Sequence, residues 1–162
     1  MCASSPIEPF TVDLEDALAT VLKFTAVEVE GSREDYPLTF YVSTIVGETL
    51  GYEIHEKPRS FRDACAAAHG LGVSLARTHG LSNIAAVFML DEIWVDLTDD
   101  VVGDAILTIG VACTGERVSA LQHIARDASG VKRIDGDARN VDSRSEVVDA
   151  FIHGLDSMRW AA

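Results

Sequence analysis

The fold is decided by the stretch DAILTIGVACTGERVSALQHIAR, residues 104–126. Its first half is rich in β-branched and aliphatic side chains, which favour a strand, and Thr114 and Gly115 then give a turn signal. A two-residue loop at this turn brings residues 116–126 back as an antiparallel partner strand. The sequence therefore predicts a β-hairpin here.

The register of this hairpin predicts a sheet with one apolar face and one polar, solvent-exposed face. With a two-residue loop, Leu107 faces Gln122, and the rest of this face is apolar, with Ala105, Leu107, Ile109, Val111, Val118, Ala120 and Ile124. The other face carries polar ones, which are Thr108, Arg117, Ser119 and His123. Such one-sided hydrophobicity is typical of an antiparallel sheet with one face in water. We expect Ile109, Val111 and Val118 to be buried. We expect Arg117 and Ser119 to be exposed.

An alternative interpretation makes residues 116–128 a helix. Val118, Leu121 and Ala125 then share one helix face, and Gly130 follows the end of the helix. In that case the fold is α/β, with three layers. The hairpin is preferred, and the helix stays open as the alternative.

Further elements flank the hairpin on both sides. Periodicity and capping signals predict helices over residues 12–24, residues 61–79 and the segment after Ser143-x-x-Glu146, with Thr11 and Ser60 as caps of the first two. Strands are expected over residues 26–30, 38–46, 52–56, 84–97 and 131–134. The predicted fold is α+β, with a mainly antiparallel sheet of about five to seven strands and three helices packed on one face.

Length and charge bound the class of protein. The 162 residues, 48% of them hydrophobic, fit a single domain over residues 1–162. A net charge of −13 repels phosphate backbones and anionic bilayers, so direct nucleic-acid binding and membrane association are not expected. The three cysteines, Cys2, Cys65 and Cys113, form no disulfide pattern, which favours a reducing, cytoplasmic location.

Catalytic signals in the sequence are incomplete. Residues 87–92, VFMLDE, have the apolar-then-acidic pattern of a Walker B segment, but the phosphate-binding G-x-x-x-x-G-K-[ST] loop is absent from the sequence. An enzyme would have to assemble its site from distant residues. The weak candidates are His69, His79, Asp91 and Glu92.

Two weak metal patterns are present. Cys65 and His69 are four residues apart on one helix face, a spacing that suits two ligands of one metal. Asp135, Asp137 and Glu146 fall at the first, third and twelfth positions of a calcium-type loop, but an arginine stands at the fifth position. We expect neither pattern to hold a metal, and we expect no cofactor.

The functional expectation is a non-enzymatic binding or assembly module, acting through a protein partner or as a subunit of a homo-oligomer or larger cellular or viral assembly. Phe10 and Trp160 are the expected interface residues, because aromatic side chains so near the chain ends need a surface to cover them. One alternative is a small enzyme built from the candidates above. Another is an acidic inhibitor or nucleic-acid mimic, suggested by six acids within residues 91–104.

Overall fold

A computed structural model describes residues 13–44, 49–79, 84–98 and 101–157. Three helices are present: α1 (Leu14–Val29), α2 (Phe61–His79) and α3 (Glu146–Ser157). The strands are β1 (Thr39–Thr44), β2 (Thr49–Glu53), β3 (Ile84–Thr98), β4 (Val101–Ala112), β5 (Arg117–Arg126), β6 (Lys132–Ile134) and β7 (Arg139–Asn140).

The seven strands form one antiparallel sheet in the order β2-β1-β3-β4-β5-β6, with β7 paired to β5. The predicted α+β class is confirmed. The alternative helix over residues 116–128 is wrong, because most of that segment forms β5. The short strand β7 had no signal in the sequence.

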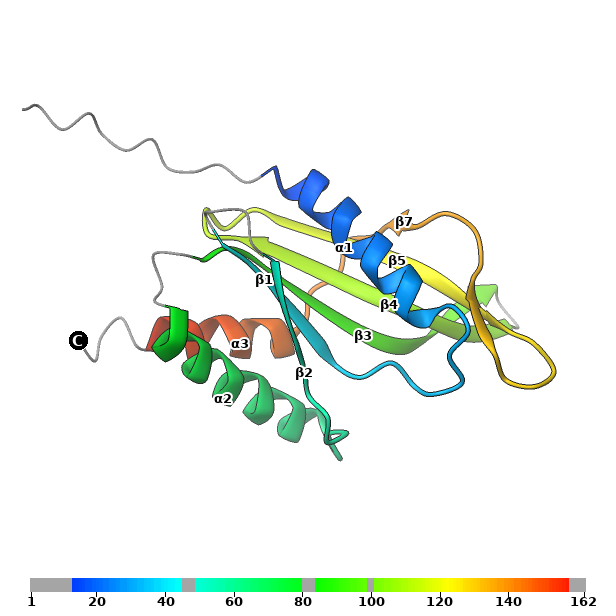
Figure 1. The fold of residues 1–162 in the computed structure, drawn as a ribbon, viewed down its shortest axis with the longest axis horizontal. Helices are drawn as coiled ribbons and strands as arrows, with labels where there is room; N and C mark the ends of the chain where they lie inside the picture. Colours follow the sequence, from blue (N-terminus) through cyan, green and yellow to red (C-terminus); the bar gives the residue numbers. More distant parts are fainter. Residues whose placement is uncertain (1–12, 45–48, 80–83, 99–100, 158–162) are drawn as a thin grey trace, which may run out of the picture.

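The helices differ from the expected arrangement because they cover both faces of the sheet (Figure 1). Helix α1 packs on one face over a cluster that includes Leu18, Phe88 and Ile106. Helices α2 and α3 pack on the other face, where the rings of Phe40 and Phe151 stack with centroids 4.3 Å apart. The sheet is therefore the middle of three layers.

The turn of the β4–β5 hairpin has three residues, 113–115, where the sequence predicted two. The Gly115 N–H donates to the Ala112 carbonyl at 2.9 Å, and the Ala112 N–H donates to the Glu116 carbonyl at 2.9 Å. Gly115 has a φ of +91°, in the left-handed region that three-residue hairpins use and glycine tolerates. The hairpin is confirmed, but the predicted register is wrong by one residue.

This shift decides which face each β5 side chain occupies. Ile109 lies opposite Ser119, and Val111 lies opposite Arg117. Because side chains alternate along a strand, a slip of one residue moves every side chain of β5 to the other face. The apolar side of β5 therefore packs toward α1, with Ala120, Ile124 and the half-buried Val118.

The burial predictions for the hairpin are confirmed for Ile109 and Val111, which are buried, and for Arg117, which is exposed. The prediction for Val118 is wrong, because this side chain is only half-buried. The prediction for Ser119 is wrong. This residue is buried, because the chain leading to α3 crosses over it. Its Oγ donates to the Val141 carbonyl at 2.5 Å and accepts from the Ser143 N–H at 3.1 Å.

The N-terminal helix is longer than predicted. Residues 26–29 continue α1 instead of forming a strand, because Val29 extends the buried stripe of Leu14, Leu18, Val21 and Thr25. The cap is Asp13, whose carboxylate accepts from two backbone N–H groups, while Thr11 lies outside the described residues.

The caps of the other two helices give one confirmed and one wrong prediction. At α2, the Asp63 N–H donates to Ser60 Oγ at 3.1 Å, as expected. At α3, the predicted capping box of Ser143 and Glu146 is wrong because the helix begins only at Glu146. Ser145 caps it instead, with its Oγ accepting from the Val147 N–H at 3.2 Å.

Candidate functional site

A network of charged side chains joins the loop before β1 to strands β3, β4, β5 and β6. Lys132 is 1% exposed, and its Nζ lies 2.6 Å from Oε2 of Glu92, which also accepts from the Tyr36 N–H at 2.6 Å. The same ammonium group donates to the Glu34 carbonyl. A buried lysine is tolerated when its charge is paired and hydrogen-bonded, and here Nζ contacts one carboxylate and one carbonyl oxygen.

Arg126 extends this network at the protein surface. Its guanidinium donates to Glu92 Oε1 at 2.9 Å and to Asp104 Oδ2 at 2.7 Å. Both oxygens of Glu92 are thus engaged with cations. The arrangement gives Glu92 a structural role, in which it ties four strands and a loop together.

A second polar cluster fastens α1 to the sheet. The hydroxyls of Tyr36 and Tyr41 donate to the two carboxylate oxygens of Glu28, at 2.7 and 2.9 Å. Burial and the hydrogen bond to Glu28 raise the pKa of Tyr41 to about 12, and the same two causes raise the pKa of Tyr36 further. The neutral phenols are therefore the favoured forms in the folded protein.

Alkaline pH is expected to weaken this cluster. An unfolded tyrosine has a pKa near 10, and the folded pKa of Tyr41 is higher, so its contribution to stability is complete below about pH 10. That contribution is lost as the pH rises from about 10 to about 12. A titration of tyrosinate absorbance should show Tyr41 ionising late, and Glu28→Gln should lower the midpoint. Ionisation at the ordinary pKa would contradict the assignment.

The structure does not gather the four candidate catalytic residues into one site. Asp91 and Glu92 are neighbours on β3, so their side chains lie on opposite faces of the sheet. His69 lies on α2 beside His153 of α3, with ring centroids 6.0 Å apart. His79 is the last residue of α2, and its side chain is outside the described part of the structure.

The candidate metal ligands are also dispersed. Across residues 13–157, apart from the gaps stated above, no three His, Cys, Asp or Glu residues are grouped as a metal site requires. Cys65 lies near Glu146, and burial followed by the charge of Glu146 raises the pKa of the thiol. Asp135 and Asp137 are exposed in the connection between β6 and β7.

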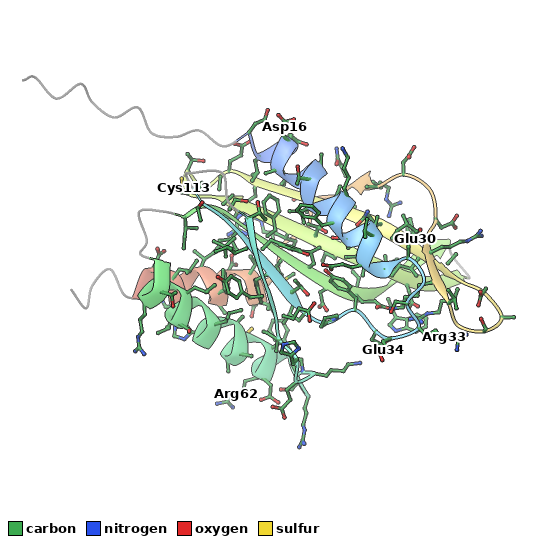
Figure 2. The ribbon with its side chains drawn as sticks, viewed as in Figure 1. Asp16, Glu30, Arg33, Glu34, Arg62 and Cys113 are labelled. Atoms are coloured by element: carbon green, nitrogen blue, oxygen red, sulfur yellow. The ribbon has the colours of Figure 1, made fainter. Side chains whose placement is uncertain are left out.

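A groove of about 1010 Å³ lies along β3 near the starts of α2 and α3, and residues from both faces of the sheet line it. These helices cover only one end of the sheet, and β3 and β4 extend beyond them (Figure 1). The floor of the groove is apolar, formed by Leu38, Ile54, Met89, Ile93, Leu107 and Val147. Figure 2 shows that Arg62, at the start of α2, is well separated from Cys113 at the hairpin end.

Two aromatic side chains border this groove, and both are largely exposed. Phe61, the first residue of α2, is 59% exposed, and Trp94 of β3 is 73% exposed. Single exposed apolar side chains are common on protein surfaces, whereas exposed apolar side chains gathered beside a groove can mark an interaction site. The sequence analysis did not select either residue, although Trp94 is one of only two tryptophans.

Asp91 is the half-buried carboxylate of the groove. Burial raises its pKa, with the charge of Glu92 adding to the effect, while a backbone hydrogen bond and Lys57 oppose it. Within the residues placed by the structure, no cationic side chain forms an ion pair with Asp91. The groove therefore offers a carboxylate that a cationic group of a ligand would stabilise.

Phe10 and Trp160, the expected interface residues, lie outside the described residues. None of the helices in the described segments is long and apolar enough to cross a membrane. Comparisons with protein-family models, curated proteins and solved structures find no match to this chain.

Proposed function

We propose that the protein is a non-enzymatic binding module that holds a segment of a partner protein in the groove between β3, the start of α2 and the start of α3. The observation that carries the proposal is the pair of exposed aromatic side chains, Phe61 and Trp94, beside an apolar floor. Tryptophan and other large side chains at the centre of a desolvated surface supply most of the energy in protein interfaces.

The chemistry of the groove supports binding over catalysis. Glu92 is held by Lys132, Arg126 and the backbone, so it is not available as a proton-transfer group. His55 lies on the rim, with Nδ1 3.7 Å from Glu53. The half-buried carboxylate of Asp91 beside apolar side chains suits recognition of a ligand that carries both a cation and apolar surface.

The kind of partner is inferred from the net charge of the protein and from its proposed location in the cell. A net charge of −13 favours a basic protein segment over a nucleic acid. The thiols of Cys65 and Cys113 are free, which supports a reducing, cytoplasmic location as part of the proposal.

The test uses a phage-displayed library of random peptides, each about a dozen residues long, selected against the purified protein. A synthetic peptide from the selection should bind Trp94→Ala at least about tenfold more weakly than the wild type, because a large aromatic contact at the border of the groove is lost. Phe61→Ala should weaken binding in the same direction. The affinities are measured by calorimetry.

The matched control is Phe24→Ala, which removes a phenylalanine that is 46% exposed on α1, away from the groove. It should leave the affinity within about twofold, since surface changes outside a binding site have small effects. If selected peptides bind Trp94→Ala and Phe61→Ala as tightly as the wild type, the groove is not the binding site.

A further inference from the structure

Two histidines meet where α2 packs against α3. His69 lies in the middle of α2 and His153 in the second half of α3, and their ring centroids are 6.0 Å apart with the rings inclined at 63°. His69 is half-buried and His153 is exposed, so the pair borders the solvent. The helix spacing pairs His69 with Cys65, whereas the fold brings it to a second histidine on another helix.

The backbones of the two helices hold this histidine pair in place. A β-carbon at Gly154, next to His153, would collide with the His69 carbonyl oxygen. Gly72, one turn after His69, meets the Phe151 carbonyl oxygen in the same way. Because these contacts join backbone to backbone, they fix the two histidine positions relative to each other. Ligands carried by packed helices define a binding site more precisely than ligands carried by loops.

The separation of the two rings suits a shared metal ion. A Zn–N bond is about 2.0–2.1 Å long and a ring nitrogen lies about 1 Å from the centroid, so two imidazoles on one tetrahedral ion have centroids about 5–6 Å apart. The observed separation of 6.0 Å is at the upper end of this range. Because His153 is exposed, its ring can turn about its side-chain torsions and direct a nitrogen toward the same point as His69.

The two imidazoles are better ligands here than the thiol of Cys65, which lies one turn before His69. Burial, followed by the charge of Glu146, raises the pKa of this thiol, so it stays protonated, and a thiol binds metal as the thiolate. The net charge of −13 also raises the concentration of cations near the protein surface.

We propose that His69 and His153 bind one divalent ion of the late first transition row, such as Zn²⁺, with water in the remaining coordination positions. Imidazole suits zinc, copper and nickel, whereas magnesium and calcium select oxygen ligands. Structural zinc sites have four protein ligands, so a site with two binds its ion more weakly and exchanges it. The bound ion would cross-link α2 to α3. This site is independent of the groove and of the proposed function.

Calorimetric titration of the protein, without a polyhistidine tag, with zinc chloride tests the site. The wild type should bind one Zn²⁺, and His69→Ala and His153→Ala should each weaken binding at least about tenfold, because one of the two metal–nitrogen bonds is lost. His55→Ala removes a histidine whose side chain is 87% exposed, and as the matched control it should change the affinity less than about twofold. Magnesium and calcium chloride should not compete with zinc.

Thermal unfolding gives a second readout and shows that each variant is folded. Zinc at one hundred times its dissociation constant should raise the Tm of the wild type by at least about 3 °C, because the ion binds the folded arrangement of the two helices. Without zinc, His153→Ala should unfold within about 2 °C of the wild type, since the side chain is exposed.

Three results would contradict the shared site. The wild type could give no heat of binding with zinc up to about 1 mM, which would exclude a useful affinity. Either histidine variant could bind zinc as tightly as the wild type, which would show that the two rings do not act together. Cys65→Ser could lose tenfold in affinity, which would assign the ion to the pair of Cys65 and His69 on one helix.

Discussion

Lys132→Met is expected to lower the free energy of unfolding by about 3–5 kcal/mol, one of the largest effects of any single substitution proposed for this chain. The substitution keeps the length of the side chain but removes its charge. Glu92 would then lose the Nζ contact at 2.6 Å while its carboxylate stays only 9% exposed. The Glu34 carbonyl would lose its donor as well. Urea denaturation followed by circular dichroism measures the loss.

Two further variants test whether the loss of stability comes from the buried ion pair of Lys132 and Glu92. Lys57→Met removes an ion pair to Asp35 at 3.4 Å in which both side chains are mostly exposed, and it should cost less than about 1 kcal/mol. Combining Lys132→Met with Glu92→Leu should recover only part of the stability, because replacing both members of a buried pair by apolar side chains is often neutral but the Tyr36 N–H and Arg126 then lose Glu92 as an acceptor. A Lys132→Met variant as stable as the wild type would show that the ammonium group is not needed.

The sequence located β6 but gave no sign that Lys132 is buried. In a three-residue strand the periodicity is too short to define a face, and the partner Glu92 is 40 residues away. Long-range ion pairs depend on how strands are ordered in the sheet, which local patterns do not encode. The sequence therefore suggested Glu92 as a catalytic candidate, whereas its contacts with Lys132, Arg126 and the Tyr36 N–H give it a structural role.

The hairpin shows how a small difference in turn chemistry changes the layers of a fold. Thr114 and Gly115 were assigned as a two-residue loop, whereas Gly115 takes the left-handed position that closes a three-residue loop. The strands were predicted well, but the shift of one residue moved the apolar side of β5 to the α1 face. The sequence consequently predicted one apolar face where there are two.

The groove could be predicted only in part. Asp91 was selected from the sequence, but for chemistry that would need a second group beside it. The sequence did not point to Phe61 and Trp94, because the exposure of these two side chains depends on where the helices begin and end in the folded protein. Strand β3 extends beyond its pairing with β1 because the two strands differ in length, and only the break at Pro37 is visible in the sequence.

Gly72→Val is expected to cost at least about 3 kcal/mol in the free energy of unfolding, because α2 and α3 meet backbone to backbone at this position. A β-carbon at Gly72 would collide with the Phe151 carbonyl oxygen and lie 3.0 Å from the Leu155 nitrogen. Gly154 faces α2 in the same way, with Val73 N 3.1 Å from a β-carbon placed there. Neither helix can make room by rotating a side chain, since the atoms in the way belong to the backbone.

Gly70→Val provides the matched control, on the same helix and two residues away. Gly70 is exposed, and a β-carbon there would meet no atom within 4 Å. Its substitution should change the stability by less than about 0.5 kcal/mol, since valine is no worse than glycine in a helix. The comparison cancels helix propensity, so the difference between the two variants reports only the separation of α2 and α3. Equal stability of both variants in thermal and urea unfolding would mean that these helices do not pack at glycine contact distance. The packing of α2 against α3, which form one layer of the fold, would then differ from the one described.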